Sequence, residues 1–442
     1  MSKVYPRNSP GRFRNLRNVV SVMLQSILFI TPWLMWGGRQ AFLMDVPARK
    51  LHLLHWTFWP QETYFILLLL ISAALTLFLV TSLFGRVWCG YACPQTLLSQ
   101  AFIMVERFTE GDSYQRVRLD DGPWNANKLS RKTVKWSIWL GMSLFLGLTF
   151  AGYFTPIRGL AADLLSGHAQ TGSLTVIGFF TLVSLAFFGN IRGRFCTTMC
   201  PYARFQGSMF DANSLIVGYD ATRGEPRGKA KDPSAGSCVD CKMCTQVCPM
   251  GIDIREGLQF ECITCAACID ACDTVMDKLG RERGLIRYAS ENELEGKSTG
   301  RLMRSRPVVY AVLLTACISI LGVLLWRRPP IEVDVMRDGV NGPFTRTADG
   351  RIANLYNLRV INKQLGNRAY AFEIKGIEGA ELMTSENPMH IPGESGVVDK
   401  VFVAVPEDAV STIVPIEFRV WDIEHPERVF VRKTTFVAGG SR

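Results

Sequence analysis

The stretch that decides the fold of this chain runs from residue 238 to residue 273 and reads CVDCKMCTQVCPMGIDIREGLQFECITCAACIDACD. It contains the spacing C-x2-C-x2-C-x3-C twice, first with Cys238, Cys241, Cys244 and Cys248 and then with Cys262, Cys265, Cys268 and Cys272. Two-cluster bacterial ferredoxins use this pattern, and the fourth cysteine of each run ligates the other cluster. The pattern therefore predicts one [4Fe–4S] cluster on Cys238, Cys241, Cys244 and Cys272, and a second on Cys262, Cys265, Cys268 and Cys248. We expect this part of the chain to transfer single electrons.

Two other uses of closely spaced cysteines fit this stretch less well. A disulfide framework needs an oxidising compartment, and structural zinc sites take two separated cysteine pairs instead of tight quartets. We therefore interpret all eight cysteines as ligands of iron–sulfur clusters.

The rest of the 442-residue chain is hydrophobic in blocks. A helix of about 20 apolar residues spans a bilayer, so these blocks predict five membrane-spanning helices. The first block begins after 17 residues and lacks a small-x-small cleavage site, and we interpret it as an anchor instead of a signal peptide. Four blocks are charge-free runs of 20 or more residues, and the fifth is weaker: 18–38, 63–85, 136–157, 307–326 and about 172–191.

Basic residues in the short loops predict the orientation. They are concentrated in the N-terminal arm and in the connection between the second and third blocks, so the positive-inside rule predicts a cytoplasmic N-terminus. Five spans then place residues 192–306 in the cytoplasm and residues 327–442 in the periplasm of a Gram-negative cell. Cysteine usage agrees, because twelve of the thirteen cysteines fall on the reducing side or at its membrane edge, and Cys317 lies inside the last span.

The net charge of +10 is mostly explained by the basic residues of these cytoplasmic segments. Aromatic–basic interleaving such as Arg12-Phe13-Arg14 is more typical of a membrane surface than of nucleic-acid binding. The chain has no glycine-rich phosphate loop, no haem-attachment C-x-x-C-H motif and no nucleophile elbow. We therefore expect the lipid bilayer, and no nucleic acid, as a partner.

The predicted fold is multidomain, with an α-helical membrane bundle, a bacterial 2[4Fe–4S] ferredoxin-like domain and a C-terminal immunoglobulin-like β-sandwich. Six β-branched or alternating segments between residues 331 and 436 predict the sandwich, which lacks a disulfide. Residues 216–236 are polar and predict a linker, and the charged residues 276–306 predict a helix returning to the membrane. The predicted domains are a cytoplasmic arm at 1–17, the membrane domain at 18–215, the ferredoxin domain at 216–306, the fifth helix at 307–326 and the sandwich at 327–442.

Two further cysteine pairs share the motif C-x3-C-P. Cys89 and Cys93 lie in GRVWCGYACP (85–94), and Cys196 and Cys200 lie in GRFCTTMCP (193–201). Each pair closes the cytoplasmic end of a predicted hairpin and precedes an amphipathic stretch (96–108 and 202–215), which indicates an internal duplication. A spacing of four predicts both thiols on one face of a helical turn, and the proline suits a helix start.

These four thiols have four interpretations from the residues alone. Thiolates are the soft ligands that Cu(I) prefers, and Met104 or Met199 offers an additional soft ligand. A redox-active dithiol is favoured by Arg86 or Arg194 and a helix N-terminus, which lower a thiol pKa. All four cysteines could instead bind a third iron–sulfur cluster, or be structural.

The remaining candidates carry weaker signals. His52 and His55, three residues apart beside tryptophans, could bind metal or haem or contact a quinol, but such a pair is more typical of an aromatic belt at the interface. His168 carries a weaker signal for a functional role than this pair. Cys317 lies among Ala, Leu and Ile and predicts a buried small hydrophobic residue.

The combination of motifs resembles the CcoG/FixG/RdxA family over essentially the whole chain. The resemblance rests on the two cysteine quartets, on CGYACP and CTTMCP, and on the tail segment NLYNLRVINK (354–363). It implies a membrane polyferredoxin that assists assembly of cbb3-type cytochrome c oxidase, acts as a cupric reductase converting Cu(II) to Cu(I), and works with a copper chaperone or exporter or with oxidase assembly factors. It carries the eight ferredoxin cysteines over as cluster ligands and Cys89, Cys93, Cys196 and Cys200 as the C-x3-C-P set. Asp273 departs from the simple ferredoxin pattern, in which proline often follows the fourth cysteine. The electron donor stays open, as does the oligomeric state, with a homodimer among the options.

Two rival functions remain at this point. A NapH-like quinol dehydrogenase subunit would pass electrons in the reverse direction, from the membrane pool out through the clusters. A scaffold with structural clusters would accept electrons from no physiological donor. The exported sandwich favours the oxidase-assembly interpretation, because it resembles a docking module outside the membrane.

Overall fold

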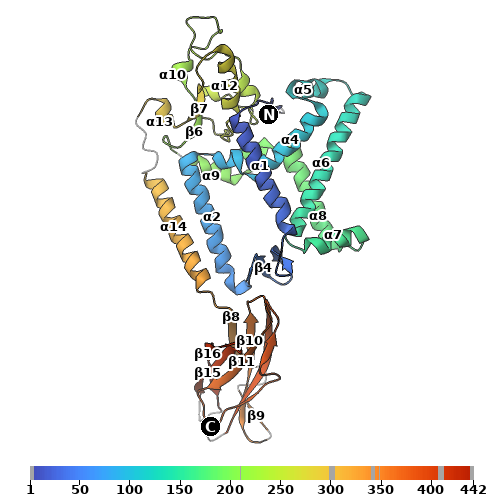
Figure 1. Cartoon of the computed structure of the whole chain (residues 1–442), viewed down its shortest axis with the longest axis vertical. Coiled ribbons are helices and arrows are strands. Elements are labelled where there is room, and N and C mark those ends of the chain that lie inside the picture. Colours follow the sequence, from blue (N-terminus) through green and yellow to red (C-terminus); the bar gives the residue numbers. More distant parts are fainter. Residues whose placement is uncertain are drawn as a thin grey trace. The chain divides into compact units, whose positions relative to one another are not determined.

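A computed structural model describes residues 4–209, 211–297, 304–339, 344–347, 349–406 and 413–438. It divides into two compact units (Figure 1). The first comprises Met1–His52 and Trp59–Val323 and contains the helical part and the ferredoxin domain. The second comprises Leu53–Phe58 and Leu324–Arg442 and contains the sandwich.

Four helices in the described part of the chain are long and apolar enough to cross a membrane. They are α2 (Thr63–Phe84), α6 (Ala126–Gly152), α8 (Thr171–Ser184), which continues into the π-helical turn η3 (Leu185–Ile191), and α14 (Ser305–Trp326). α14 runs beside α2, where the Ser72 hydroxyl lies 3.2 Å from the Cys317 sulfur (Figure 1). α6 packs closely on α8 because Gly147 has no side chain, and a Cβ there would lie 2.7 Å from the Ile177 carbonyl oxygen.

The first apolar block differs from the prediction. Helix α1 (Arg12–Ile30) ends before the block does and is not among the four. Pro32 has no N–H to donate to the Leu28 carbonyl, and the Tyr153 hydroxyl donates to that carbonyl instead at 2.9 Å. The 3₁₀ turn η1 (Thr31–Trp33) follows, and β1 (Met35–Trp36) and β2 (Arg39–Gln40) pair around two glycines of positive φ. The prediction of one helix over 18–38 is therefore wrong beyond Ile30.

Shorter elements connect these helices. The segment between α1 and α2 contains β3 (Phe42–Asp45), β4 (Lys50–Leu53), β5 (Trp56–Phe58) and η2 (Pro60–Glu62). The predicted amphipathic stretch at 96–108 forms α4 (Pro94–Glu110), whereas the second forms α9 (Pro201–Met209) and ends well before residue 215. The other connecting helices are α3 (Val87–Tyr91), α5 (Ser113–Asp121), α7 (Ile157–Ser166) and the π-helical turn η4 (Phe195–Met199).

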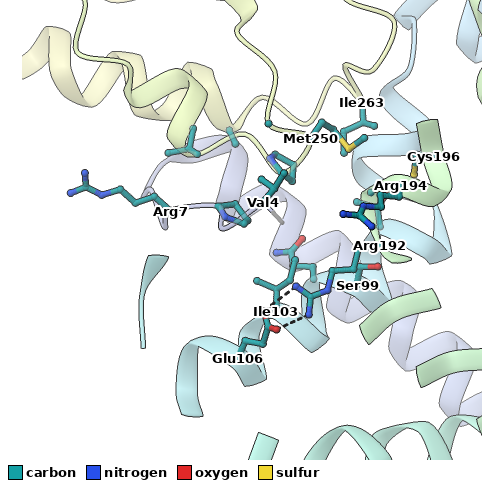
Figure 2. Close-up of a pocket in the computed structure, with 18 of the residues that line it drawn as sticks. Val4, Arg7, Ser99, Ile103, Glu106, Arg192, Arg194, Cys196, Met250 and Ile263 are labelled. Atoms are coloured by element: carbon teal, nitrogen blue, oxygen red, sulfur yellow. Dashed lines mark hydrogen bonds and ion pairs between the residues drawn. The ribbon is translucent and has the colours of Figure 1, made fainter. Parts of the chain in front are cut away.

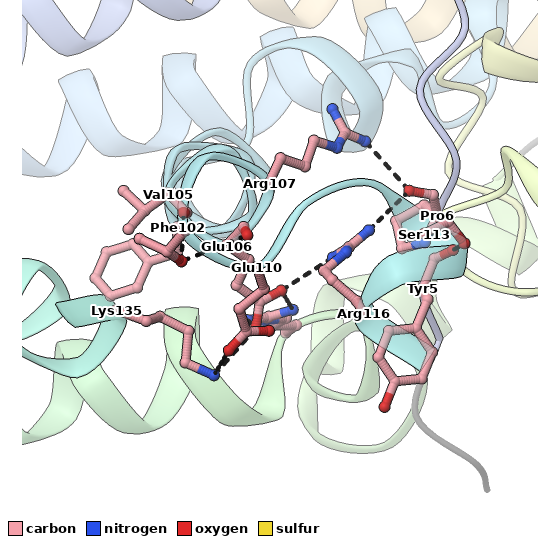
Figure 3. Close-up of polar contacts among 12 residues, drawn as sticks. Tyr5, Pro6, Phe102, Val105, Glu106, Arg107, Glu110, Ser113, Arg116 and Lys135 are labelled. Carbon is pink, nitrogen blue, oxygen red and sulfur yellow. Dashed lines mark hydrogen bonds and ion pairs between the residues drawn. The ribbon is translucent and has the colours of Figure 1, made fainter. Parts of the chain in front are cut away.

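A buried ionic network joins α4, α5, α6 and η3 (Figure 3). Glu106 accepts from Arg116 at 3.1 Å and from Arg192 at 2.8 Å, and Glu110 pairs with Lys135 at 2.8 Å. Both carboxylates are almost fully buried, with 1% and 0% of their side chains exposed. Buried charges are tolerated only when they are paired, so this network holds α4 in one position against the membrane helices.

The ferredoxin domain is built on a small hydrophobic core as well as on its cysteines. Strand β6 (Ile216–Tyr219) pairs antiparallel with β7 (Ile286–Ala289), and Val217, Leu285 and Ile286 are buried. The predicted linker over 216–236 is therefore wrong in its first four residues, and the predicted return helix over 276–306 contains a strand. The domain's helices are α10 (Ala221–Gly224), α11 (Met243–Gln246), η5 (Ile254–Glu256), α12 (Ala267–Leu279) and α13 (Glu291–Leu294).

The second unit is the predicted β-sandwich. One sheet has the order β12-β14-β10-β8, with β9 also paired to β10, and the other has the order β13-β11-β15-β16. Alternating residues of both sheets fill the core, including Tyr356, Val403 and Phe418, so packing holds this disulfide-free domain. The strands are β8 (Ile331–Arg337), β9 (Thr345–Arg346), β10 (Ile352–Asn362), β11 (Arg368–Lys375), β12 (Glu381–Met383), β13 (Met389–Ile391), β14 (Ser395–Val405), β15 (Ile413–Asp422) and β16 (His425–Val437).

Candidate electron-transfer site

The eight ferredoxin cysteines surround two small adjacent cavities. Cys238, Cys241, Cys244 and Cys272 line one, which is the set that the crossed ligand pattern assigns to one cluster. Cys248, Cys262, Cys265 and Cys268 line the other, together with Cys244. Because Cys244 borders both cavities, two clusters held there would be close neighbours.

The backbone around the two cavities repeats one uncommon conformation. The residues on either side of the second cysteine of each run have positive φ: Asp240 and Lys242 in the first run, and Thr264 and Ala266 in the second. Side chains other than glycine rarely adopt this conformation, and it persists where the surroundings demand it. Alternating right- and left-handed residues turn successive N–H groups toward one point and form anion-binding concavities such as those of iron–sulfur sites. The cavities therefore suit a thiolate-ligated cluster, which is anionic.

The thiols of these cavities are poor acids without metal. Burial raises the pKa of Cys248 to about 11 and that of Cys262 and Cys272 to about 12. The pKa of Cys268 is raised well above its usual value for the same reason. Iron must therefore displace the protons when it binds, and the free energy of metal binding becomes part of the folding free energy of this domain.

The four C-x3-C-P cysteines gather at one place. Burial, together with the charges of Cys93, Cys89 and Cys200, raises the pKa of Cys196 to about 12. Burial likewise raises the pKa of Cys89 to about 11, against the opposing effect of the Arg86 guanidinium. The two motifs, which are more than 100 residues apart in the sequence, are thus close enough for their thiols to interact electrostatically, and we call these four cysteines the four-thiol site.

The local geometry of each motif differs from the predicted helical turn. Cys93 has an extended backbone and caps α4, which Pro94 begins, and Cys200 likewise ends η4 before Pro201 begins α9. The prolines start helices as predicted, but the second thiol of each pair lies at a junction and does not share a continuous helix face with the first. Among the described residues, no three Cys, His, Asp or Glu side chains are close enough together to hold a single metal ion.

The four-thiol site lies directly against the second ferredoxin cavity. Cys89 belongs to the same buried apolar cluster as Ile263, Cys265 and Val247. A Cβ on Gly90 would lie 2.6 Å from the Ile263 carbonyl oxygen and 2.9 Å from the Cys265 Cα, so only glycine allows this approach. Arg86, which is 4% exposed, donates to Gln206 at 2.8 Å and to the Phe260 carbonyl. The fold therefore places the first cavity, the second cavity and the four thiols one after another in space.

A cavity of about 1130 Å³ opens beside this arrangement. Figure 2 shows its walls: Ser99, Ile103 and Glu106 of α4, Val4 of the N-terminal arm, and Met250 and Ile263 of the ferredoxin domain. Cys196 lines it as well, so one of the four thiols is reachable from the cavity. Molecules could approach the four-thiol site by this route.

Comparison with known proteins identifies the relatives of this chain. It is 39% identical over 423 residues to the nitrogen fixation protein FixG of Rhizobium meliloti, covering 86% of this chain and 80% of that protein. It is 39% identical over 390 residues to the protein RdxA of Cereibacter sphaeroides, covering 85% of this chain and 83% of that one. The chain belongs to the FixG family.

Family profiles agree with the arrangement of the domains. Residues 191–291 match a 4Fe-4S dicluster domain, and residues 321–439 match the "IG-like fold at C-terminal of FixG". Residues 66–108, which include Cys89 and Cys93, match a 4Fe-4S binding domain. A more distant match, 25% identical over 216 residues and covering 46% of this chain and 66% of the other, is the ferredoxin-type protein NapH of Haemophilus influenzae. This FixG-family chain is a membrane iron–sulfur electron-transfer protein.

One functional contact of the FixG-family chain is not evident in its sequence. The Asp270 carboxylate accepts the backbone N–H groups of Phe13 at 3.1 Å and Arg14 at 2.8 Å, and so caps α1 from the ferredoxin domain. Arg17 donates to the Cys265 carbonyl at 3.3 Å. Residues 13–17 of the predicted cytoplasmic arm therefore connect the membrane part with the second cavity. No local pattern signals this connection, because the partners are about 250 residues apart.

The three candidate histidines and Cys317 line neither the two ferredoxin cavities nor the large cavity. His52 is buried in β4, and the His55 ring lies 4.2 Å from the Trp56 ring. His168 follows α7. Cys317 is buried within α14, as predicted. Met104 and Met199 are mostly exposed, at 66% and 53%.

Proposed function

We propose that this chain reduces Cu(II) to Cu(I) at the four-thiol site and so supports assembly of the copper centre of a cbb3-type cytochrome c oxidase. The observation that carries the proposal is the gathering of Cys89, Cys93, Cys196 and Cys200 against the wall of the second ferredoxin cavity. In this proposal the substrate is the copper ion, which gains one electron.

The eight ferredoxin cysteines would hold two [4Fe–4S] clusters, in the crossed sets that line the two cavities. When bound, these clusters supply one-electron redox chemistry. The surrounding residues exclude water from the second cavity, where Ile263, Val247 and Ala271 are buried. Asp273, in place of a proline after the last cysteine, would shift the potential of one cluster.

The four thiols suit the product better than the substrate. Thiolates are soft ligands and prefer Cu(I) to Cu(II), so binding there favours reduction. The same preference retains Cu(I), and its release requires a partner with a competing thiol or thioether site, such as a copper chaperone or exporter. Oxidase assembly factors are the other partner class, and the sandwich is a candidate surface for docking them.

We further propose the orientation that the basic loops predict, with a cytoplasmic N-terminus and a periplasmic sandwich. This requires five crossings, and α1 would have to be the fifth. Its 19 residues extend about 28 Å, close to the thickness of a bilayer core. A C-terminal alkaline phosphatase fusion should be active and a C-terminal green fluorescent fusion dark. The opposite result would indicate that only the four longer helices cross.

The quinol dehydrogenase function remains the second candidate. The large cavity favours it, because Trp136 and Trp139 lie in its lining with polar Gln95 and Ser99 and with a wall formed by the ferredoxin domain. The similarity to NapH adds support. In that case quinol would reduce the clusters of the protein in membranes, and Cu(II) would not reoxidise them.

The decisive experiment compares a variant with all four C-x3-C-P cysteines changed to serine with the control Cys317→Ser. Cys317 is a buried cysteine outside the site, so its replacement controls for the loss of a thiol. After anaerobic reduction with dithionite, we expect the wild type and the control to reduce Cu(II) and the quadruple variant to fail while keeping eight irons per chain. Unchanged cupric reductase activity and copper content in the quadruple variant would refute the proposal. Twelve irons in the wild type and eight in the variant would instead identify a third cluster.

A further inference from the structure

The cavity beside the four-thiol site contains a cluster of arginines that the redox function does not use. Arg14 and Arg17 of α1 and Arg107 of α4 all line it. Within the described residues, none of these three guanidinium groups forms an ion pair with a carboxylate; their hydrogen bonds go to Asn8, Pro6 and the Cys265 carbonyl. This contrasts with Arg116 and Arg192 nearby, both of which pair with Glu106.

The arginines of this cluster that lack a carboxylate partner donate to neutral oxygen atoms. Arg14 donates to the Asn8 side-chain oxygen at 2.7 Å, and Arg107 reaches the same oxygen at 3.5 Å. Arg107 and Arg116 both donate to the Pro6 carbonyl, at 3.3 and 3.1 Å (Figure 3). Burial lowers the pKa of Arg107, the positive charges of Arg116, Arg14 and Arg17 lower it further, and the negative charge of Asp112 opposes them in part. Like charges converge here on acceptors that neutralise none of them.

Two of these guanidinium groups also have hydrogen-bond capacity to spare. The Nε atoms of Arg17 and Arg107 are buried and have no acceptor in the part of the chain that the structure describes. A buried donor without a partner costs free energy, and guanidinium donors match phosphate oxygens in geometry and charge. The carboxylates that line the cavity do not fill this role: Glu106 and Asp253 are paired with arginines, Asp270 caps α1, and Glu256 and Glu261 belong to the ferredoxin wall.

The surroundings of the cluster fit the headgroup of an amphiphile. Arg17 directly precedes the apolar run at 18–38, and Trp136 begins the apolar run at 136–157. The cavity therefore lies where charged sequence changes to membrane sequence, and Ile103, Met104 and Trp136 add an apolar wall to it. Basic groups at this level attract anionic lipid headgroups.

We propose that Arg14, Arg17 and Arg107 form a binding site for the phosphate of an anionic phospholipid, lined on its apolar side by α4 and α6. The bound phosphate would neutralise the repulsion among the arginines. It would also brace the N-terminal arm, whose Arg17 holds the Cys265 carbonyl of the second cavity. The lipid thereby stabilises the docking of the ferredoxin domain on the membrane part.

The test uses the full chain in detergent and native mass spectrometry with added phosphatidylglycerol or phosphatidylcholine. The site variant is Arg14→Gln with Arg107→Gln. The matched control is Arg118→Gln with Arg131→Gln, two exposed arginines of α5 and α6 that do not line the cavity. We expect the wild type and the control to retain one phosphatidylglycerol in preference to phosphatidylcholine, and the site variant to bind it about tenfold or more weakly.

Equal retention of the two lipids by the wild type, or equal retention of phosphatidylglycerol by the site variant, would overturn the proposal. Displacement of phosphatidylglycerol by millimolar inorganic phosphate would support the phosphate site but identify a soluble source for its ligand. If the double variant does not fold, Arg14→Gln alone serves, because among the described residues that side chain bonds only to Asn8. Retention of its clusters, seen in the visible spectrum, verifies the fold.

Discussion

The two C-x3-C-P segments share a sequence pattern and differ in structure. The first forms the α-helical turn α3, and its Cys89 and Arg86 are 6% and 4% exposed. The second forms the π-helical turn η4; its Arg194 is exposed and its Cys196 lines the large cavity. One copy is thus an interior part of the site, and the other forms its accessible side.

The contacts of the two copies with the ferredoxin domain explain the difference. Gly90 of the first copy lies against backbone atoms of Ile263 and Cys265, which cannot move without disturbing the second cavity. Gly193 of the second copy lies against the Met250 side chain, which is flexible. A duplicated motif has therefore been divided into a rigid docking surface and an adaptable entrance, and single substitutions should affect the two copies unequally.

The largest effect is expected from the thiols themselves, where the copies should behave alike. Cys89→Ser and Cys196→Ser should each abolish most cupric reductase activity, and the double variant should be little worse than either, because residues that act as one unit are not additive. Activity with purified, cluster-containing protein is the measurement. Two partial losses that multiply in the double variant would mean that the motifs work independently.

The next largest effect is expected from the arginines, which should contribute unequally to stability in the two copies. Arg86→Gln removes buried charge-assisted hydrogen bonds to Gln206 and Phe260 and should cost about 3 kcal/mol of unfolding free energy. Arg194→Gln removes an exposed charge and should cost less than about 1 kcal/mol. Denaturant unfolding followed by cluster absorbance compares the two. Equal losses would contradict the assignment of a rigid and an adaptable copy.

A smaller difference is expected from the glycines. Gly90→Ala places a Cβ 2.6 Å from a carbonyl oxygen and should destabilise the domain by about 1–3 kcal/mol. In Gly193→Ala the nearest atom is the Met250 sulfur at 3.1 Å, and the cost should stay below about 0.5 kcal/mol. The rate of cluster loss on exposure to a chelator reports the same contrast. A more labile cluster in the Gly193 variant would reverse the roles of the copies.

The smallest effect concerns Met199, at the exposed side of the second copy. Its side chain is 53% exposed, so Met199→Leu should change stability by less than about 0.5 kcal/mol and leave Cu(II) reduction unaltered. Copper titration of the protein with its four C-x3-C-P cysteines intact, with and without this change, provides the comparison. A clear loss of copper affinity would identify Met199 as a ligand after all.

Much of this organisation follows from local patterns. The cysteine quartets predicted their crossed sets, and the alternation in the tail predicted six strands of the sandwich within a few residues. Apolar length predicted α2, α6, α8 and α14. Predictions failed where a distant partner overrides the local pattern. Residues 216–219 look like linker but pair with β7. The end of α1 at Ile30 has a local cause that apolar length alone does not show, because Pro32 cannot continue its hydrogen bonds.

The sequence by itself determined what chemistry the chain carries, because ligand type and ligand spacing within a run are local properties. Only the tertiary structure decided where that chemistry is directed. The meeting of Cys89, Cys93, Cys196 and Cys200, the contact of Gly90 with Cys265 and the capping of α1 by Asp270 all join residues from distant parts of the chain. Such contacts depend on how helices pack, since burial and hydrogen bonding select them among many alternatives that are locally equivalent.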